Sequence, residues 1–187
     1  LALTGIVPNM RVGAPRDGAR LKEILRGCME ITNAPSMVRF PKGAVPADIP
    51  ALERVSGVDV LHRGASKKVL LISVGAMAGM ALEVAQLAQA QGIEITVVDP
   101  VWVKPISPAV IALCADYEAV IVVEDGIKHA GIASTMSESL REAGSQCSVH
   151  SIGVPLEFIE HSKRNEILED LKITPAAIVQ QIAGWIS

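Results

Sequence analysis

The sequence predicts an α/β fold whose larger part is a doubly wound, mostly parallel sheet. Half of the 187 residues are hydrophobic, yet only 3% are aromatic. Apolar runs of strand length alternate with helical patterns from residue 68 to residue 187. Nearly continuous apolar strands, alternating with helices, are typical of parallel sheets that are covered on both faces.

The first segment, residues 1–43, has a strand–helix–strand pattern. Residues 10–14 and 36–40 are candidate short strands. Between them, apolar residues at helical spacing follow Asp17, a suitable N-cap, to about residue 31. Two short strands and one helix can bury little surface. We therefore expect the tail of a larger α/β domain; the alternative is a small independent subdomain.

Residues 44–67 lose this regular pattern. Prolines, glycines and charged residues are interspersed through the segment, which is typical of an interdomain linker. A short strand at residues 58–61 is the one element that the pattern suggests. The predicted division is therefore 1–43, a linker 44–67, and a C-terminal domain 68–187.

The elements of the third segment follow in order. The predicted strands cover residues 69–74, 93–99, 119–124 and 149–153. Helical spacing or capping residues predict helices at 77–88, 107–115, 132–143, 166–171 and 175–186. Ser107 and Thr174, each followed by proline, are the clearest N-caps.

Composition argues against several function classes. The formal net charge is −3 and the basic residues are scattered, so we expect no nucleic-acid partner. The longest largely apolar run, residues 69–82, is too short to cross a membrane. The three cysteines and four histidines show no metal-ligand spacing, which favours reduced thiols, a cytoplasmic location and no metal site.

Candidate binding residues lie after the strands, because ligands of open parallel sheets bind beyond the carboxyl ends of the strands. The turn at residues 75–79 matches no phosphate-binding motif, which favours a tight structural turn. Asp99 is interpreted as a cation ligand or, more readily, as a structural acid. Residues 124–131 carry two acids, a lysine and His129, either as a site or as loop structure. No nucleophile–base pair is identified, so no catalytic residue is predicted.

Arg39 is the strongest single candidate. It stands at the end of a short strand, close to Lys42. A guanidinium in such a place can bind a phosphate through two hydrogen bonds. The alternative is an exposed or salt-bridged arginine.

Five stretches resemble the 1-deoxy-D-xylulose-5-phosphate synthase family, in order over nearly the whole chain. They are residues 5–17, 35–43, 97–105, 123–126 and 153–161. The parts around Asp99 and Glu124 are also similar to transketolases and to the β-type subunits of 2-oxo acid dehydrogenases. Trp102 and residues 158–161 favour the synthase, whereas residues 127–130 depart from the glycine-rich form that is commoner in the family.

The resemblance implies an enzyme that uses thiamine diphosphate and Mg²⁺. Such an enzyme condenses pyruvate with glyceraldehyde 3-phosphate, with loss of CO2, and is expected to be a homodimer. Residues 1–43 would end its pyrimidine-binding domain, and residues 68–187 would be its transketolase-type C-terminal domain. The chain starts at Leu1 rather than at methionine, so we expect a piece of a longer protein.

Of the family's functional residues, the resemblance maps only Arg39, which would bind the phosphate of the aldehyde. The motif that holds magnesium has no match here. We therefore expect that this chain alone binds no cofactor and is inactive. Two alternatives stay open: a C-terminal piece of a transketolase or of a 2-oxo acid dehydrogenase β-subunit, and a non-catalytic oligomerisation module.

Overall fold

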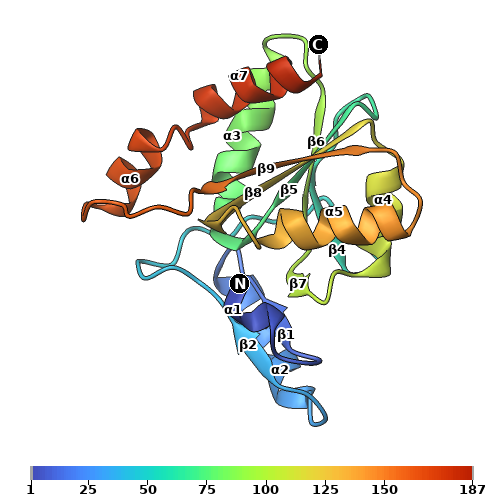
Figure 1. The fold of residues 1–187 in the computed structure, drawn as a ribbon, viewed down its shortest axis with the longest axis vertical. Helices are drawn as coiled ribbons and strands as arrows, with labels where there is room; N and C mark the ends of the chain where they lie inside the picture. Colours follow the sequence, from blue (N-terminus) through green and yellow to red (C-terminus); the bar gives the residue numbers. More distant parts are fainter. Residues whose placement is uncertain (1, 187) are drawn as a thin grey trace.

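A computed structural model describes residues 2–186 and contains a larger and a smaller sheet (Figure 1). The strands are β1 (Arg11–Gly13), β2 (Ser36–Val38), β3 (Glu53–Val55), β4 (Val58–His62), β5 (Val69–Ser73), β6 (Ile95–Asp99), β7 (Trp102–Lys104), β8 (Ala119–Ile127) and β9 (Ser148–Val154). The helices are α1 (Ala2–Gly5), α2 (Gly18–Glu30), α3 (Ala78–Gln89), α4 (Pro108–Ala115), α5 (Ile132–Glu142), α6 (Arg164–Asp170) and α7 (Pro175–Trp185), with a 3₁₀ turn at Gly75–Met77.

The larger sheet has six strands in the order β3-β4-β6-β5-β8-β9. Strand β5 is parallel to β6 and β8, and β8 is parallel to β9, whereas β3 and β4 run antiparallel. Helices α3 and α7 cover one face, and α4 and α5 cover the other (Figure 1). The predicted doubly wound, mostly parallel sheet is confirmed.

Strand β5 shows why the sequence folds this way. All five of its residues are buried, because helices cover both faces. Val69 and Leu71 point into the core beneath α3 and α7. Leu70 and Ile72 alternate with them and point into the core beneath α4 and α5.

The prediction of a linker at residues 44–67 is wrong for its second half. The predicted short strand is present as β4, which pairs antiparallel with β6 along a buried edge. Strand β3, which the sequence pattern did not suggest, pairs with β4. An antiparallel hairpin therefore extends the parallel sheet where a simple connection was expected.

The smaller sheet has the order β2-β1-β7. Strand β1 is parallel to β2, as the strand–helix–strand pattern predicts, and antiparallel to β7. Because β7 follows β6 after a short turn, residues 102–104 complete a sheet that begins more than 80 residues earlier. Neither β7 nor this pairing was predicted.

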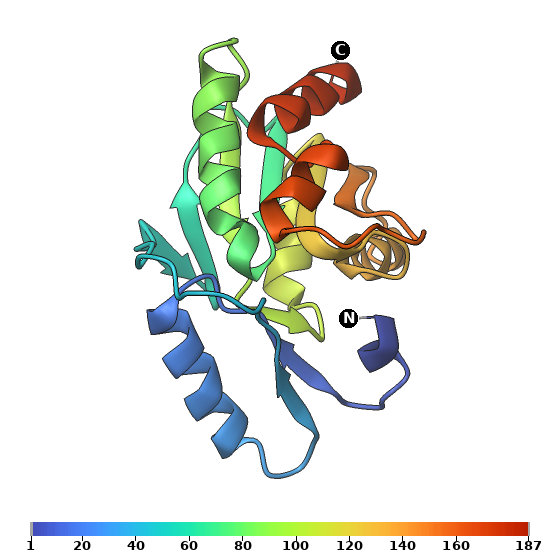
Figure 2. The same cartoon turned by 90° about the vertical axis from the view of Figure 1, so that its left-hand side faces the viewer.

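Helix α2 packs along the small sheet, apart from the helices of the larger sheet (Figure 2). Asp17 is its N-cap, as predicted, and accepts a hydrogen bond of 2.8 Å from the backbone N–H of Arg20. A Cβ atom on Gly13 would lie 2.3 Å from Cγ2 of Ile24. A glycine is therefore needed at position 13 of β1 for α2 to approach the strand this closely.

Candidate functional site

Arg39 lies where the small sheet meets the larger one. Its backbone N–H donates a hydrogen bond of 2.8 Å to the carbonyl of Gly13, which extends the pairing of β2 with β1. This backbone contact aims the side chain at β8, where Nη1 of Arg39 forms an ion pair with Oδ1 of Asp125. The salt-bridged alternative is thus realised, and 23% of the Arg39 side chain is still exposed.

A second arginine binds the same carboxylate. Nη2 of Arg164, the first residue of α6, lies 3.2 Å from Oδ2 of Asp125 and 3.4 Å from the sulfur of Met77. The Asp125 side chain is only 7% exposed, while that of Arg164 is 40% exposed. Segments from both sheets and from the C-terminal helices therefore meet at one carboxylate. Sequence reasoning did not single out Arg164, because its partner Asp125 is 39 residues away.

Glu124, the neighbouring acid, has a structural role. Its side chain is fully buried, and Oε1 accepts a hydrogen bond of 2.9 Å from the backbone N–H of Ile132 at the start of α5. Burial raises the pKa of Glu124, against the backbone N–H groups of Ile132 and Ala133 and the charge of Arg39. Glu124 therefore caps α5, whereas Asp125 is the acid that pairs with Arg39 and Arg164.

Two exposed residues of the predicted cluster, Lys128 and His129, do not form a general-base site. His129 is exposed and, among residues 2–186, has no side-chain hydrogen bond or ion pair. Lys128 is exposed as well and donates through its backbone N–H to the carbonyl of Val154. Residues 124–127 of the cluster belong to β8, and for residues 128–131 the loop interpretation fits these contacts better than a general-base role.

Asp99 has a structural role rather than that of an exposed cation ligand. It is fully buried, accepts 2.8 Å from the backbone N–H of Val101, and lies 2.7 Å from Nη1 of Arg16. Burial raises its pKa to about 6, although the contacts with Arg16 and Val101 work in the opposite direction.

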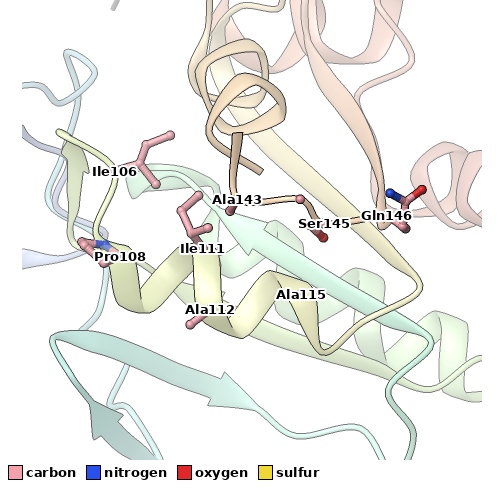
Figure 3. A pocket seen from close by; sticks show the side chains of 9 residues that line it. Ile106, Pro108, Ile111, Ala112, Ala115, Ala143, Ser145 and Gln146 are labelled. Atoms are coloured by element: carbon pink, nitrogen blue, oxygen red, sulfur yellow. The ribbon is translucent and has the colours of Figure 1, made fainter. Parts of the chain in front are cut away.

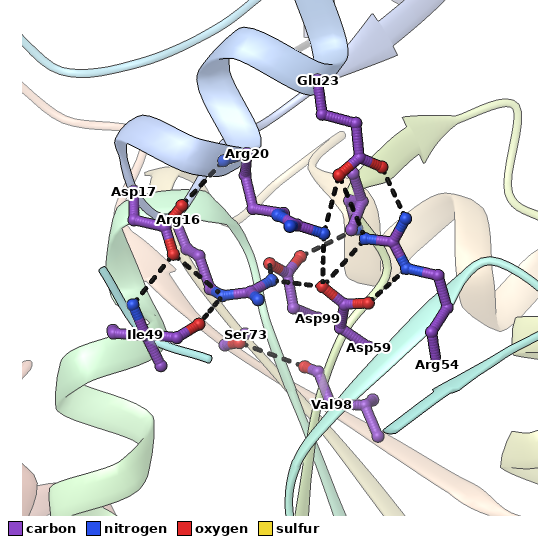
Figure 4. Close-up of polar contacts among 11 residues, drawn as sticks. Arg16, Asp17, Arg20, Glu23, Ile49, Arg54, Asp59, Ser73, Val98 and Asp99 are labelled. Carbon is purple, nitrogen blue, oxygen red and sulfur yellow. Dashed lines mark hydrogen bonds and ion pairs between the residues drawn. The ribbon is translucent and has the colours of Figure 1, made fainter. Parts of the chain in front are cut away.

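Arg16 joins the two sheets through a buried ion-pair network (Figure 4). The guanidinium binds Asp59 from β4 and Asp99 from β6, each at 2.7 Å, and Nε donates to the carbonyl of Ile49. Asp59 also binds Arg54, which reaches Glu23 of α2. The partners are distant in sequence, so no local pattern could reveal this network.

A cavity of about 720 Å³ lies away from these charges (Figure 3). It is formed by residues 106–115 on the α4 side and by the turn at residues 143–146. Its lining side chains carry no ionisable group, so it offers no acid–base chemistry.

The described part of the chain lacks two further features. Among residues 2–186, no three histidine, cysteine, aspartate or glutamate side chains are grouped so that they could hold a metal ion. No helix in the same range is long and apolar enough to span a membrane.

Residues 56–178 match the family model described as "Transketolase, C-terminal domain". The chain is 46% identical over its whole length to 1-deoxy-D-xylulose-5-phosphate synthase of Leifsonia xyli subsp. xyli, of which it covers 29%. It is 42% identical to the synthase of Nocardia farcinica, of which it covers 31%. The chain thus spans about three tenths of the length of these curated relatives.

Solved structures show the same fold. A split-gene transketolase, described as an inactive β4 tetramer, aligns with 98% of this chain and 60% of its own at a TM-score of 0.86 and 29% identity. A transketolase from Pichia stipitis covers 98% of the chain at a TM-score of 0.76 and 18% identity, over 26% of its own length. The family model, the sheet order and these structures agree: the chain belongs to the transketolase C-terminal-domain family.

Proposed function

We propose that the chain is the C-terminal part of a 1-deoxy-D-xylulose-5-phosphate synthase. The observation that carries this proposal is 42–46% identity over the entire chain to curated synthases. Identity to the transketolase structures is lower, 29% and 18%. The whole protein would condense pyruvate with glyceraldehyde 3-phosphate, with loss of CO2.

Such an enzyme uses thiamine diphosphate and Mg²⁺. Mg²⁺ prefers oxygen ligands in octahedral geometry, and among residues 2–186 no three histidine, cysteine, aspartate or glutamate side chains are grouped to hold a metal ion. Other parts of the whole protein would hold both cofactors. The residues of this chain therefore have no proposed role in the chemistry that takes place on the cofactor.

Within the whole enzyme, Arg39 would bind the phosphate of glyceraldehyde 3-phosphate. Its guanidinium is partly exposed where the two sheets meet, and Asp125 fixes its position. A planar guanidinium presents paired N–H donors that match two phosphate oxygens. The contribution of this chain to catalysis would be substrate binding rather than chemistry.

The test uses the complete synthase that contains this chain. We expect formation of 1-deoxyxylulose 5-phosphate from pyruvate and glyceraldehyde 3-phosphate. Arg39→Ala should raise KM for the phosphorylated aldehyde roughly 10- to 100-fold, since one charge-assisted contact is worth about 1.5–3 kcal/mol. KM for pyruvate should change less than about twofold.

Three results would contradict these assignments. A wild-type enzyme that accepts ketose donors instead of pyruvate would favour a transketolase, and one that forms acyl-CoA through a lipoyl carrier would favour a 2-oxo acid dehydrogenase. A rise of KM for pyruvate that exceeds the rise for the aldehyde in Arg39→Ala would remove Arg39 from the phosphate site.

We further propose that the whole enzyme is a cytoplasmic homodimer. The similar split-gene transketolase is described as a tetramer of one chain type, which supports self-association through this fold. The free thiols of Cys28, Cys114 and Cys147 support a reducing compartment. Light scattering of the purified enzyme tests the assembly, and a monomeric mass would exclude the dimer.

A further inference from the structure

We propose that Arg164 is a second phosphate-binding residue of the same site, and that Asp125 is the positioning residue that holds it beside Arg39. This inference rests on the proposed function, because it takes the phosphorylated aldehyde as the ligand. Nothing in the sequence pattern suggested a role for Arg164 beyond a solvated charge.

The first argument is the geometry of the shared carboxylate. Oδ1 of Asp125 forms an ion pair with Arg39, which directly follows β2. Oδ2 forms an ion pair with Arg164 of α6. The two oxygens of one carboxyl group are close together, so the two guanidiniums are held as neighbours. The carboxylate is only 7% exposed, whereas the arginine side chains are 23% and 40% exposed. The charges therefore face outward from a buried anchor.

The second argument is the charge that this arrangement creates. Two guanidiniums face the single carboxylate of Asp125, and the buried acid beside it, Glu124, also interacts with Arg39. Asp125 needs only one arginine as counter-ion, and holding a second guanidinium nearby costs Coulombic repulsion. An exposed arginine gains little from a surface ion pair, so the pairing alone does not explain why Arg164 lies here. A phosphate monoester that binds between the two guanidiniums would reduce their mutual repulsion.

The third argument concerns hydrogen-bond donors. Each guanidinium has five N–H donors. Within the described residues, the side chain of Arg39 has Asp125 as its partner through Nη1 alone. Arg164 uses Nη2 for both Asp125 and the sulfur of Met77. The contact with Met77 seats the guanidinium, and its other N–H groups are available to phosphate oxygens.

The experiment measures steady-state kinetics of the complete synthase with three variants. Arg164→Ala should raise KM for glyceraldehyde 3-phosphate about tenfold, as expected for the loss of one charge-assisted hydrogen bond. KM for pyruvate should stay within about twofold. Asp125→Asn should raise KM for the aldehyde in the same direction. Arg164→Lys keeps the charge but not the paired N–H donors of the guanidinium. Its KM for the aldehyde should lie between those of Arg164→Ala and wild type.

Arg141→Ala is the matched control, because Arg141 is an exposed arginine at the end of α5. Equal aldehyde KM values for Arg164→Ala and Arg141→Ala, in an enzyme in which Arg39→Ala does raise that value, would overturn the role of Arg164 alone. Equal rises of KM for pyruvate and aldehyde would also overturn it, because they indicate a general structural defect. A lowered aldehyde KM in Asp125→Asn would show that Asp125 competes with the phosphate and would exclude its positioning role.

Inactivity of the wild-type enzyme with both substrates would instead refute the proposed function. The two failures are thus distinguishable from the same set of assays.

Discussion

Asp59 and Asp99 bind the same nitrogen of Arg16, but their ionisation differs. Burial opposes the charge of both groups. For Asp59, hydrogen bonds from Arg54 and Arg16 outweigh burial and hold its pKa below the usual value. Asp99 has Arg16 as its one arginine partner among the described residues, and burial raises its pKa to about 6. Asp99 therefore takes up a proton before Asp59 does as the pH falls.

This difference predicts how stability depends on pH. Because the pKa of Asp99 is about 6 in the folded state and 3.8 for an ordinary aspartate, the folded state binds the proton more tightly between these values. Its contribution to stability is present at acid pH and is lost as pH rises through 6. Asp99→Asn removes this titration. The free energy of unfolding of the variant, minus that of wild type, should therefore be larger at pH 7.5 than at pH 4.5.

Urea unfolding at the two pH values measures this effect. Asp116→Asn is the control, because the Asp116 side chain is 62% exposed and its pair with Lys67 lies at the surface. The same difference between Asp99→Asn and wild type at both pH values would contradict the pKa of Asp99.

Prediction from sequence succeeded at this scale where the cause is local. The cap at Asp17 follows from the residues next to it. The partners of Arg39 and Arg16 lie 86 and 83 residues away, at Asp125 and Asp99. No spacing rule connects such residues, so the ion pairs could be found only in the folded chain.

Helix α5 shows the same limit at the scale of an element. Its N-cap residue, Gly131, has no side chain, and the cap is Glu124 of β8 instead. A Cβ atom on Gly131 would lie 2.2 Å from Oε1 of Glu124. The periodicity of α5 could be predicted, but not the buried acid that caps it.

Gly131→Ala should therefore destabilise the protein by about 1–3 kcal/mol, as overpacking does. Gly79→Ala is the matched control, since Gly79 lies in α3 and a Cβ atom there would have no neighbour within 4 Å. It should raise stability by about 0.5–1 kcal/mol, because alanine favours helix. Thermal unfolding compares both with wild type, and a Gly131→Ala variant as stable as Gly79→Ala would contradict the close contact.

Strands that need a distant partner were the elements that sequence patterns missed. The pattern predicted β5, β6 and β8, whose apolar runs are long, and also β9. Strands β3 and β7 have three residues each and exist through their pairing with β4 and β1. Three residues are too few to show a period; β1 and β2 are as short, but a helical pattern lies between them and marked a strand–helix–strand unit.

At the scale of the whole molecule, the two sheets depend on each other. Strand β7 completes the small sheet, and Arg16 neutralises Asp59 and Asp99 of the larger one. The prediction that residues 1–43 end a larger α/β domain stays a prediction. The alternative of an independent subdomain would leave β1 without its antiparallel partner.

Removal of residues 1–43 tests this dependence. A chain of residues 44–187 should lose stability, because Asp59 and Asp99 lose the charge of Arg16. The loss should be smaller at pH 5 than at pH 8, since protonation removes the charges that lack a counter-ion. Urea unfolding of both chains at both pH values measures it. A loss that is equal at the two pH values would show that lost packing, not charge, dominates.

The pairing of β1 with β7 also sets the order of events during synthesis. The ribosome produces β1 and β2 long before residues 102–104. One edge of β1 therefore stays unpaired until β7 has been synthesised. Contacts between residues so far apart form late, because a long loop must close first. Arg39 therefore reaches its final position only after much of the larger sheet has folded.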